Sequence, residues 1–161
     1  MSGTAEPYGI EGLPLLEARK KVLSAVTPTQ KTETIALDKA LGRVNAKPVL
    51  AQEAVPGFRA SVMDGYALGQ HTQPQQGDQW TLEGRSAPGA PFPGSLSHGG
   101  AIRILTGAPL PPGAGWVLPQ ELVSTRDTEL TLKGNASDNP WIRAADEECK
   151  AEDCLLDPGQ R

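Results

Sequence analysis

Glycine and proline interrupt this chain so often that most of it can form only short secondary-structure elements. They make up about a fifth of the 161 residues, with 18 glycines and 15 prolines. This share is below the level typical of disordered chains, and the length allows a modest hydrophobic core. The sequence therefore predicts short strands and many turns, with no long helix beyond the N-terminal region.

The segment from Leu13 to Val26 is predicted to be an amphipathic helix. Its apolar residues recur at helical spacing, with charged residues between them. Such a stripe favours a helix that packs on the core of its own chain, and the alternative is a helix that also contributes to a subunit contact. The stripe consists of Leu15, Leu16, Ala18, Val22, Leu23 and Val26.

Three short elements are expected between this helix and residue 50. Lys31–Leu37 has the composition of a strand, and Asp38 and Gly42 are suited to begin and end a helical turn. Arg43–Leu50 is expected to be extended and to lie at a sheet edge, because it contains a proline.

A compact β unit is expected in the centre of the chain, where brief apolar segments alternate with glycine and proline. The fold class is therefore α+β, with a small, mostly β domain at residues 67–134 inserted into a discontinuous, helix-bearing domain at residues 13–66 and 135–161. Residues 1–12 are expected to be a flexible tail. The four apolar segments are WTLEG, AIRILTG, WVLPQELV and ELTLKG.

Composition argues against several classes of function. The net charge is −4 and no window is strongly basic, so a nucleic-acid surface is not expected. No apolar run approaches the length of a membrane span, and the first residues do not resemble a signal peptide. Cys149 and Cys154 lack the further ligands of a zinc site, and reduced thiols are favoured over a disulfide or a metal. Reduced thiols lead us to expect a cytoplasmic protein.

The first candidate site residue is Asp64, which lies in the stretch PGFRASVMDGYALG (residues 56–69). Asp64 is followed by Gly65, and a glycine lets a ligand or another backbone approach the carboxylate closely. One interpretation is a carboxylate that faces an anionic ligand or Mg²⁺. The other is a turn residue whose side chain binds its own backbone, for which Asp-Gly is a frequent choice.

A second candidate is Thr106, which follows an apolar strand and precedes Gly107 and a proline-rich segment. Its hydroxyl could lie at the mouth of the strand, but from the residues alone a simple connecting turn is the favoured interpretation. Ser61 has no nearby base and could simply cap a turn. Arg103 could meet a phosphate or a carboxylate, or form a structural ion pair.

Four motifs in this chain resemble those of the MoeA family, the molybdopterin molybdenumtransferases, which includes the C-terminal part of gephyrin. The first is P-x-F-x-x-S-x-M-D-G-Y-A, which begins at Pro56. The others are ALGRV, IRILTGAPLPPGA and an altered motif that begins at Ile142. The resemblance covers roughly residues 13–159 and stops where the N-terminal region of the family, domains I and II, stops.

The resemblance implies the insertion of molybdate into adenylylated molybdopterin, with Mg²⁺ as cofactor and AMP as a product. It also implies a homodimer of the full-length protein. The nucleotide-cradling domain and the following β domain of the family have no counterpart in these 161 residues. The chain is therefore expected to supply one wall of the site and to be inactive alone. The implied catalytic residues are Asp64, Thr106 and Glu148, and the implied substrate-binding residues are Ser61, Gly65 and Gly107, with no metal ligand assigned.

Several positions depart from the family pattern. The final motif resembles N-I-R-x-x-G-E-D, but this chain has Trp141 for Asn, Asp146 for Gly and Glu148 for Asp. Gly115 and Trp116 replace the usual aspartate and alanine. These changes keep open an alternative, a truncated or scaffold-like module of the same family that binds or dimerises without catalysis.

Overall fold

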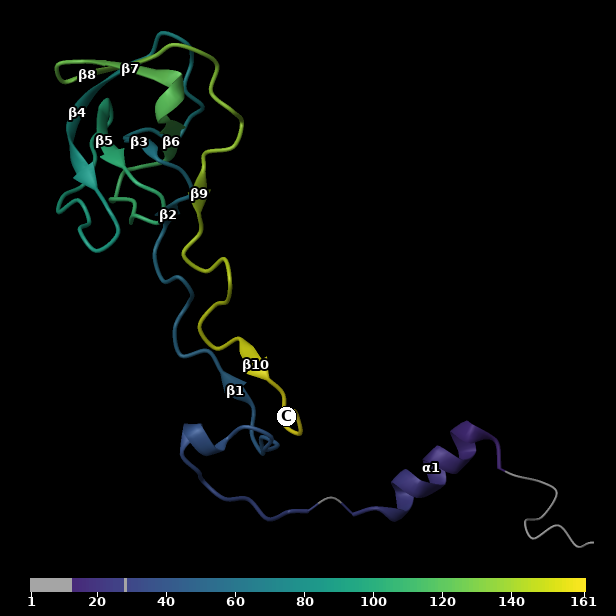
Figure 1. The fold of residues 1–161 in the computed structure, drawn as a ribbon. Coiled ribbons are helices and arrows are strands. Elements are labelled where there is room, and N and C mark those ends of the chain that lie inside the picture. The colour runs from purple at the N-terminus through teal and green to yellow at the C-terminus, as the bar shows by residue number, and fades with distance from the viewer. Residues whose placement is uncertain (1–12, 28) are drawn as a thin grey trace, which may run out of the picture.

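The computed structural model describes residues 13–27 and 29–161 and is mostly β, with one α-helix. The expected tail at residues 1–12 lies outside the described residues. Helix α1 (Leu15–Ala25) forms where the apolar periodicity predicts it, with Pro14 at its N-cap. The 3₁₀ helix η1 (Leu37–Lys39) follows, without the side-chain cap expected of Asp38. Figure 1 shows α1 apart from the rest of the chain.

A six-stranded sheet carries most of the core, and its strands lie in the order β6-β3-β5-β4-β8-β7. Only β4 and β5 pair in parallel. The edge strands β6 and β7 are joined by the 3₁₀ helix η2 (Gln120–Leu122), which indicates that the sheet curls back on itself (Figure 1). The strands are β3 (Gly65–Leu68), β4 (Gln79–Ser86), β5 (Gly100–Ile104), β6 (Trp116–Pro119), β7 (Val123–Arg126) and β8 (Glu129–Leu132).

The part of the sheet formed by β3, β5 and β6 is buried on both faces, each against its own apolar cluster. Successive side chains on a strand point to opposite faces. Ala67 accordingly packs with Ile102 and Val117, whereas its neighbour Leu68 packs with Trp80 and Leu118. Burial on both faces explains why β3, β5 and β6 are nearly continuous apolar runs. β4 and β8, in contrast, alternate between buried and more exposed residues.

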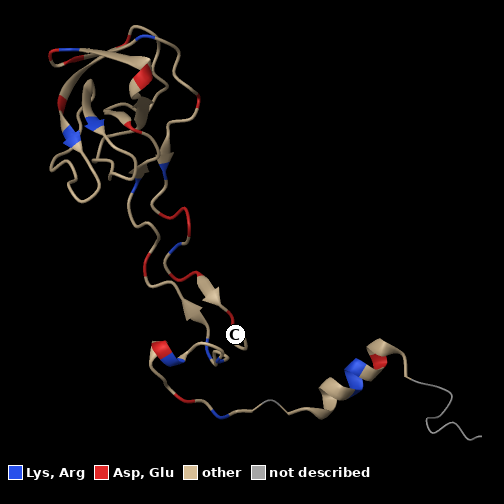
Figure 2. Cartoon of the chain, in the orientation of Figure 1, with Lys and Arg blue, Asp and Glu red and all other residues tan. Residues whose placement is uncertain are grey.

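The chain enters the sheet through one extended segment and leaves it through another, and the two lie side by side as a stalk (residues 49–61 and 142–156; Figure 1). Acidic and basic residues are interspersed along it (Figure 2). The expected boundary between residue 66 and the β domain at residue 67 falls inside strand β3, because the sheet begins at Gly65. The stalk pairs β1 (Val49–Leu50) with β10 (Cys154–Leu156) and β2 (Ala60–Ser61) with β9 (Ile142–Arg143), both antiparallel.

Three expectations for the N-terminal region are wrong. Lys31–Leu37 is not a strand, and only Val49–Leu50 of the expected extended segment pairs in a sheet. Strand propensity needs a partner and a surface to cover, and no described segment pairs with Lys31–Leu37. Helix α1 does not pack on the core of its own chain, because none of its residues is buried. Its leucines remain exposed, for example Leu16 at 78% and Leu23 at 62%.

Candidate functional site

The sheet brings Asp64 and Thr106 together, although 42 residues separate them in the sequence. Gly65, the first residue of β3, pairs with Ile104, the last residue of β5. Asp64 just before β3 therefore lies beside Thr106 just after β5. Asp64 Oδ1 accepts hydrogen bonds from Thr106 N (2.8 Å) and from Thr106 Oγ1 (2.7 Å).

The carboxylate of Asp64 is held in its ionised form at an exposed position. The two hydrogen bonds from Thr106, first the backbone and then the side-chain bond, lower the pKa of Asp64, and the nearby charge of Arg103 lowers it further. The second oxygen, Oδ2, has no hydrogen-bond partner among the described residues. Asp64 thus differs from an Asx-turn residue, because its bonds reach across the sheet rather than to its own turn.

Arg103 forms no ion pair with a carboxylate among the described residues. Its guanidinium donates to the carbonyl oxygen of Gly65 (2.8 Å) and to Gln120 Oε1 (2.5 Å). It also lies 5.2 Å from the ring centre of Tyr66, a distance typical of a cation–π contact.

An open pocket of about 390 Å³ lies next to Thr106, between the sheet and the stalk. Thr106 and Gly107 form part of its wall, and Ser61 of β2 contributes another part. The apolar side chains of Phe58 and Val62 are 44% and 42% exposed there. The remaining lining residues are Pro56, Ala60, Arg143 and Glu147.

The three expected substrate-binding residues have clear structural roles. The Ser61 hydroxyl donates to Met63 O (2.6 Å) and Ser61 is only 2% exposed, so it fixes the local turn. Gly107 adopts a positive φ of 78° and donates its N–H to Ser61 O (2.8 Å). Gly65 is buried, and a Cβ there would lie 2.0 Å from Leu118 O on the neighbouring strand.

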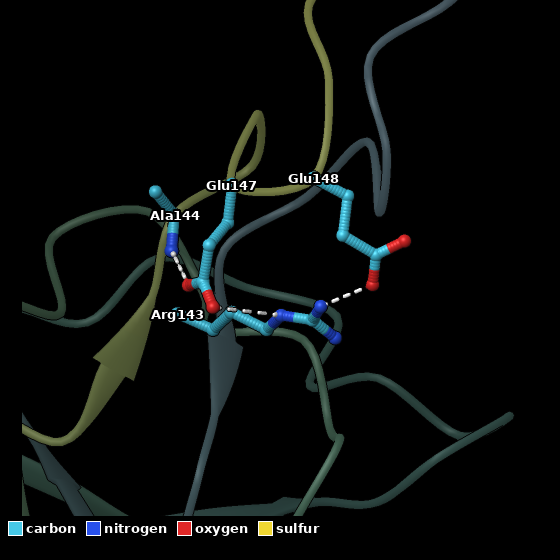
Figure 3. Close-up of polar contacts among 4 residues, drawn as sticks. All are labelled: Arg143, Ala144, Glu147 and Glu148. Atoms are coloured by element: carbon cyan, nitrogen blue, oxygen red, sulfur yellow. Dashed lines mark hydrogen bonds and ion pairs between the residues drawn. The ribbon is translucent and has the colours of Figure 1, made fainter.

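Glu148 lies in a separate group on the stalk (Figure 3), where it forms an ion pair with Arg143 Nη2. Glu147 flanks the same guanidinium, with Oε1 3.4 Å from Arg143 Nε, and accepts a bond from Ala144 N (3.3 Å). Both acids turn toward Arg143, and the Glu148 hydrogen bond is the main cause of its raised pKa. Glu148 forms no hydrogen bond or ion pair with Asp64 or Thr106, so the structure does not join the three expected catalytic residues.

Arg143 and Glu147 line the pocket with Thr106, although the sequence had not suggested them as site residues. A signal was present, because both belong to the part of the final motif that this chain retains. β9 pairs with β2, with Ile142 opposite Ser61, and this register brings the final motif beside the MDGY motif. This strand register cannot be predicted from the sequence of either segment alone.

Two of the departures from the family pattern have a structural explanation. A Cβ at Gly115 would lie 2.3 Å from His71 Nδ1, so His71 occupies the space that an aspartate side chain would need. Trp141 has a positive φ of 55°, a conformation that asparagine tolerates far better than tryptophan. Packing of Trp141 against the cluster of Ile102 and Val117 accompanies this strained backbone.

The described residues contain no group of three or more His, Cys, Asp or Glu side chains that could hold a metal ion. Cys149 and Cys154 are both free thiols. Within the same residues, no helix has the length and hydrophobicity needed to cross a membrane.

Comparison with known proteins agrees with this architecture. Residues 13–161 match the profile of the family described as the MoeA N-terminal region (domain I and II). The chain belongs to the MoeA family. This MoeA region is 34% identical over 148 residues to a molybdopterin molybdenumtransferase of Haemophilus influenzae, a match that covers 91% of this chain and 36% of the relative. The protein of the same name from Staphylococcus epidermidis is 29% identical over 149 residues, covering 90% of this chain and 35% of the relative.

Solved structures agree with the same fold. A molybdopterin biosynthesis moeA protein from Pyrococcus horikoshii matches with a TM-score of 0.74 and 26% identity, covering 92% of this chain and 40% of that one. The MoeA region described here spans about a third of the length of the curated relatives it matches. It corresponds to the N-terminal region of the molybdopterin molybdenumtransferases.

Proposed function

We propose that this chain supplies one wall of the site at which molybdate is inserted into adenylylated molybdopterin. The observation that carries the proposal is the exposed Asp64 carboxylate. Thr106 fixes Oδ1 with two hydrogen bonds, and Oδ2 remains without a partner among the described residues. A carboxylate held in this way is preorganised and charged, so it can act on a ligand at little cost in reorganisation.

Asp64 is also the residue that we propose to contact Mg²⁺. Magnesium is usually held by one or two carboxylates together with substrate phosphates and water, rather than by a complete protein cage. One exposed carboxylate oxygen beside an open pocket fits such a partial site. When bound, the ion would neutralise negative charge on the phosphate oxygens of the adenylylated substrate.

Thr106 orients Asp64, and the pocket beside it could accept part of the substrate. Gly107 and Ser61 shape its wall, while Phe58 and Val62 offer an apolar surface that would exclude water. Glu148 forms an ion pair with Arg143 on the stalk, so it would act through Arg143 and at a distance from Asp64. We place this reaction in the cytoplasm.

The proposal can be tested in a chimera in which residues 13–161 replace the matching region of the Haemophilus influenzae relative. Release of AMP would be measured with adenylylated molybdopterin, molybdate and Mg²⁺. Asp64→Asn keeps the shape of the side chain and removes its charge. We expect it to lower the rate at least about 100-fold, as loss of a preorganised electrostatic group does.

Asp78→Asn is the matched control. Asp78 also accepts a hydrogen bond from a backbone N–H, that of Gln75 (2.9 Å). It lies just before the first residue of β4, whereas the last residue of that strand, Ser86, pairs with Ile104 near Thr106, so Asp78 lies at the end of β4 away from the candidate site. Asp78→Asn should leave the rate unchanged, and equal rates for the two variants would contradict the proposal.

Helix α1 supports a second proposal, that the full-length protein is a homodimer that uses this helix. None of the residues in its apolar stripe is buried by the described part of the chain. An exposed stripe of this kind indicates a contact with another surface. The same observation favours the alternative function, a non-catalytic dimerisation or scaffold module, and the pairing of Glu148 with Arg143 fits it as well. An active chimera would exclude that alternative.

A further inference from the structure

Arg103 connects three parts of the chain that surround Asp64. It lies near the end of β5, opposite Tyr66 of β3, and it is only partly exposed. One nitrogen, Nη1, donates to Gly65 O (2.8 Å), the carbonyl directly after Asp64. The other, Nη2, donates to Oε1 of Gln120 (2.5 Å), the first residue of η2 directly after β6. A planar guanidinium can make both contacts at once, which a lysine ammonium cannot do with the same geometry.

These contacts reach Asp64 from both sides of its backbone. Gln120 N donates to Asp64 O (3.3 Å), so the residue held by Arg103 Nη2 in turn holds the main chain of Asp64. Thr106, which binds the side chain of Asp64, lies three residues after Arg103 in the same segment. The Tyr66 ring restricts the guanidinium further, because the cation lies 5.2 Å from its centre.

We propose that Arg103 is a positioning residue for Asp64: its bonds to Gly65 O and Gln120 Oε1 fix the Asp64 backbone so that Oδ1 stays on Thr106 and Oδ2 faces outward. The importance of this arrangement for molybdate insertion rests on the proposed function. The positioning itself does not, and it can be measured on the 161-residue chain without any substrate.

Arg85 offers a matched control within the sheet. It lies on β4 directly beside Arg103, as its partner in the parallel β4–β5 register. Partner residues on adjacent strands share a face of the sheet, so Arg85 carries the same charge on the same face. Arg85 is exposed and has no hydrogen bond or ion pair among the described residues. A general effect of positive charge on this face should therefore appear in Arg85 variants as well.

The test is an NMR titration of the Thr106 amide, whose proton is bonded to Asp64 Oδ1. Its chemical shift should follow the protonation of Asp64, so the midpoint reports the Asp64 pKa and the amplitude reports how well the bond is held. Arg103→Gln should lose most of the amplitude and raise the midpoint. Arg103→Lys, which keeps the charge without the two-pronged contact, should also lose amplitude, and its midpoint should rise less than that of Arg103→Gln because the charge is kept. Arg85→Gln should change neither.

Three results would overturn the proposal. The first is a wild-type amplitude and midpoint in Arg103→Gln, and the second is an equal change in Arg85→Gln. The third is a uniform change of the amide shifts across the sheet, which would show a general structural role, because amides of β3 and β5 away from the site should keep their shifts. If Arg103→Gln does not fold, Arg103→Lys decides the question through its amplitude. If Arg103→Gln loses amplitude but Asp64→Asn has normal activity in the chimera, the positioning role of Arg103 is supported and the proposed function is refuted.

Discussion

Replacement of Gly65 by alanine should break the contact between β3 and β6 next to the candidate site. The added Cβ would lie 2.0 Å from Leu118 O and 2.9 Å from Leu118 C, both backbone atoms that cannot rotate away. Non-bonded heavy atoms prefer roughly 3.5 Å, so the two strands would have to separate by about 1 Å or more. The clash arises at the pair Gly65–Pro119, at one end of the β3–β6 ladder.

The expected cost follows from overpacking and from the weakened ladder. Overpacking in a tight site costs about 1–3 kcal/mol, and each weakened backbone hydrogen bond adds about 1 kcal/mol. We expect Gly65→Ala to lower the free energy of unfolding by about 3–4 kcal/mol. For a chain of this size that corresponds to a decrease in Tm of about 10 °C, measurable by calorimetry or by circular dichroism.

Gly89→Ala is the control for this measurement. Gly89 has a positive φ of 75° but nothing within 4 Å of its added Cβ, so only backbone strain of about 1–2 kcal/mol is expected. If Gly65→Ala proves no more destabilising than Gly89→Ala, the close approach of β3 and β6 is not what requires a glycine at residue 65.

Three further results are expected. The bonds from Thr106 lower the pKa of Asp64, so the stability that this contact contributes should be fully present above the ordinary carboxyl pKa of 3.8 and be lost as the pH falls through the lowered value. Urea unfolding measured as a function of pH should therefore lose this acid-side dependence in Asp64→Asn. An unchanged pH profile would refute the prediction. On α1, the double variant Leu16→Glu with Leu23→Glu should abolish self-association measured by light scattering and change the Tm of the sheet little, whereas the control Lys20→Glu should still self-associate. A monomeric wild type, or a double variant that still associates, would contradict a role of the stripe in assembly. The 161-residue chain alone should release no AMP from adenylylated molybdopterin, and clear turnover would show that the other wall of the site is not needed.

Strands β4, β5, β6 and β8 were predictable because they combine apolar residues with flanking glycine and proline, whereas β3 and most of β7 were not predicted. The segments WTLEG, AIRILTG, WVLPQELV and ELTLKG all contribute to observed strands. Local patterns also located helix α1. They could not show that the helix leaves its apolar stripe exposed, because periodicity indicates that a surface will be covered and does not say by which chain.

The candidate site was predictable only in part, and the reason is register. Asp64 and Thr106 could each be suggested from local sequence, yet their contact depends on the pairing of Gly65 with Ile104. The contributions of Arg143 and Glu147 depend in the same way on the pairing of β2 with β9. Such pairings join distant segments, and alternation within a single segment does not specify them. The strand predicted at Lys31–Leu37 is absent for a related reason, because no described segment pairs with it.

The most direct test of the Asp64–Thr106 arrangement is the ratio of AMP-release rates for Thr106→Ser and Thr106→Val in the chimera. Serine keeps the hydroxyl that donates to Asp64 Oδ1 at 2.7 Å, and valine replaces it with a methyl group of similar size. Both variants keep the backbone N–H bond at 2.8 Å. If the hydroxyl orients the carboxylate for the reaction, the serine variant should retain a rate close to wild type and the valine variant should be slower by about tenfold or more. Equal rates for the two variants would contradict the proposal that this pair forms the working part of the site.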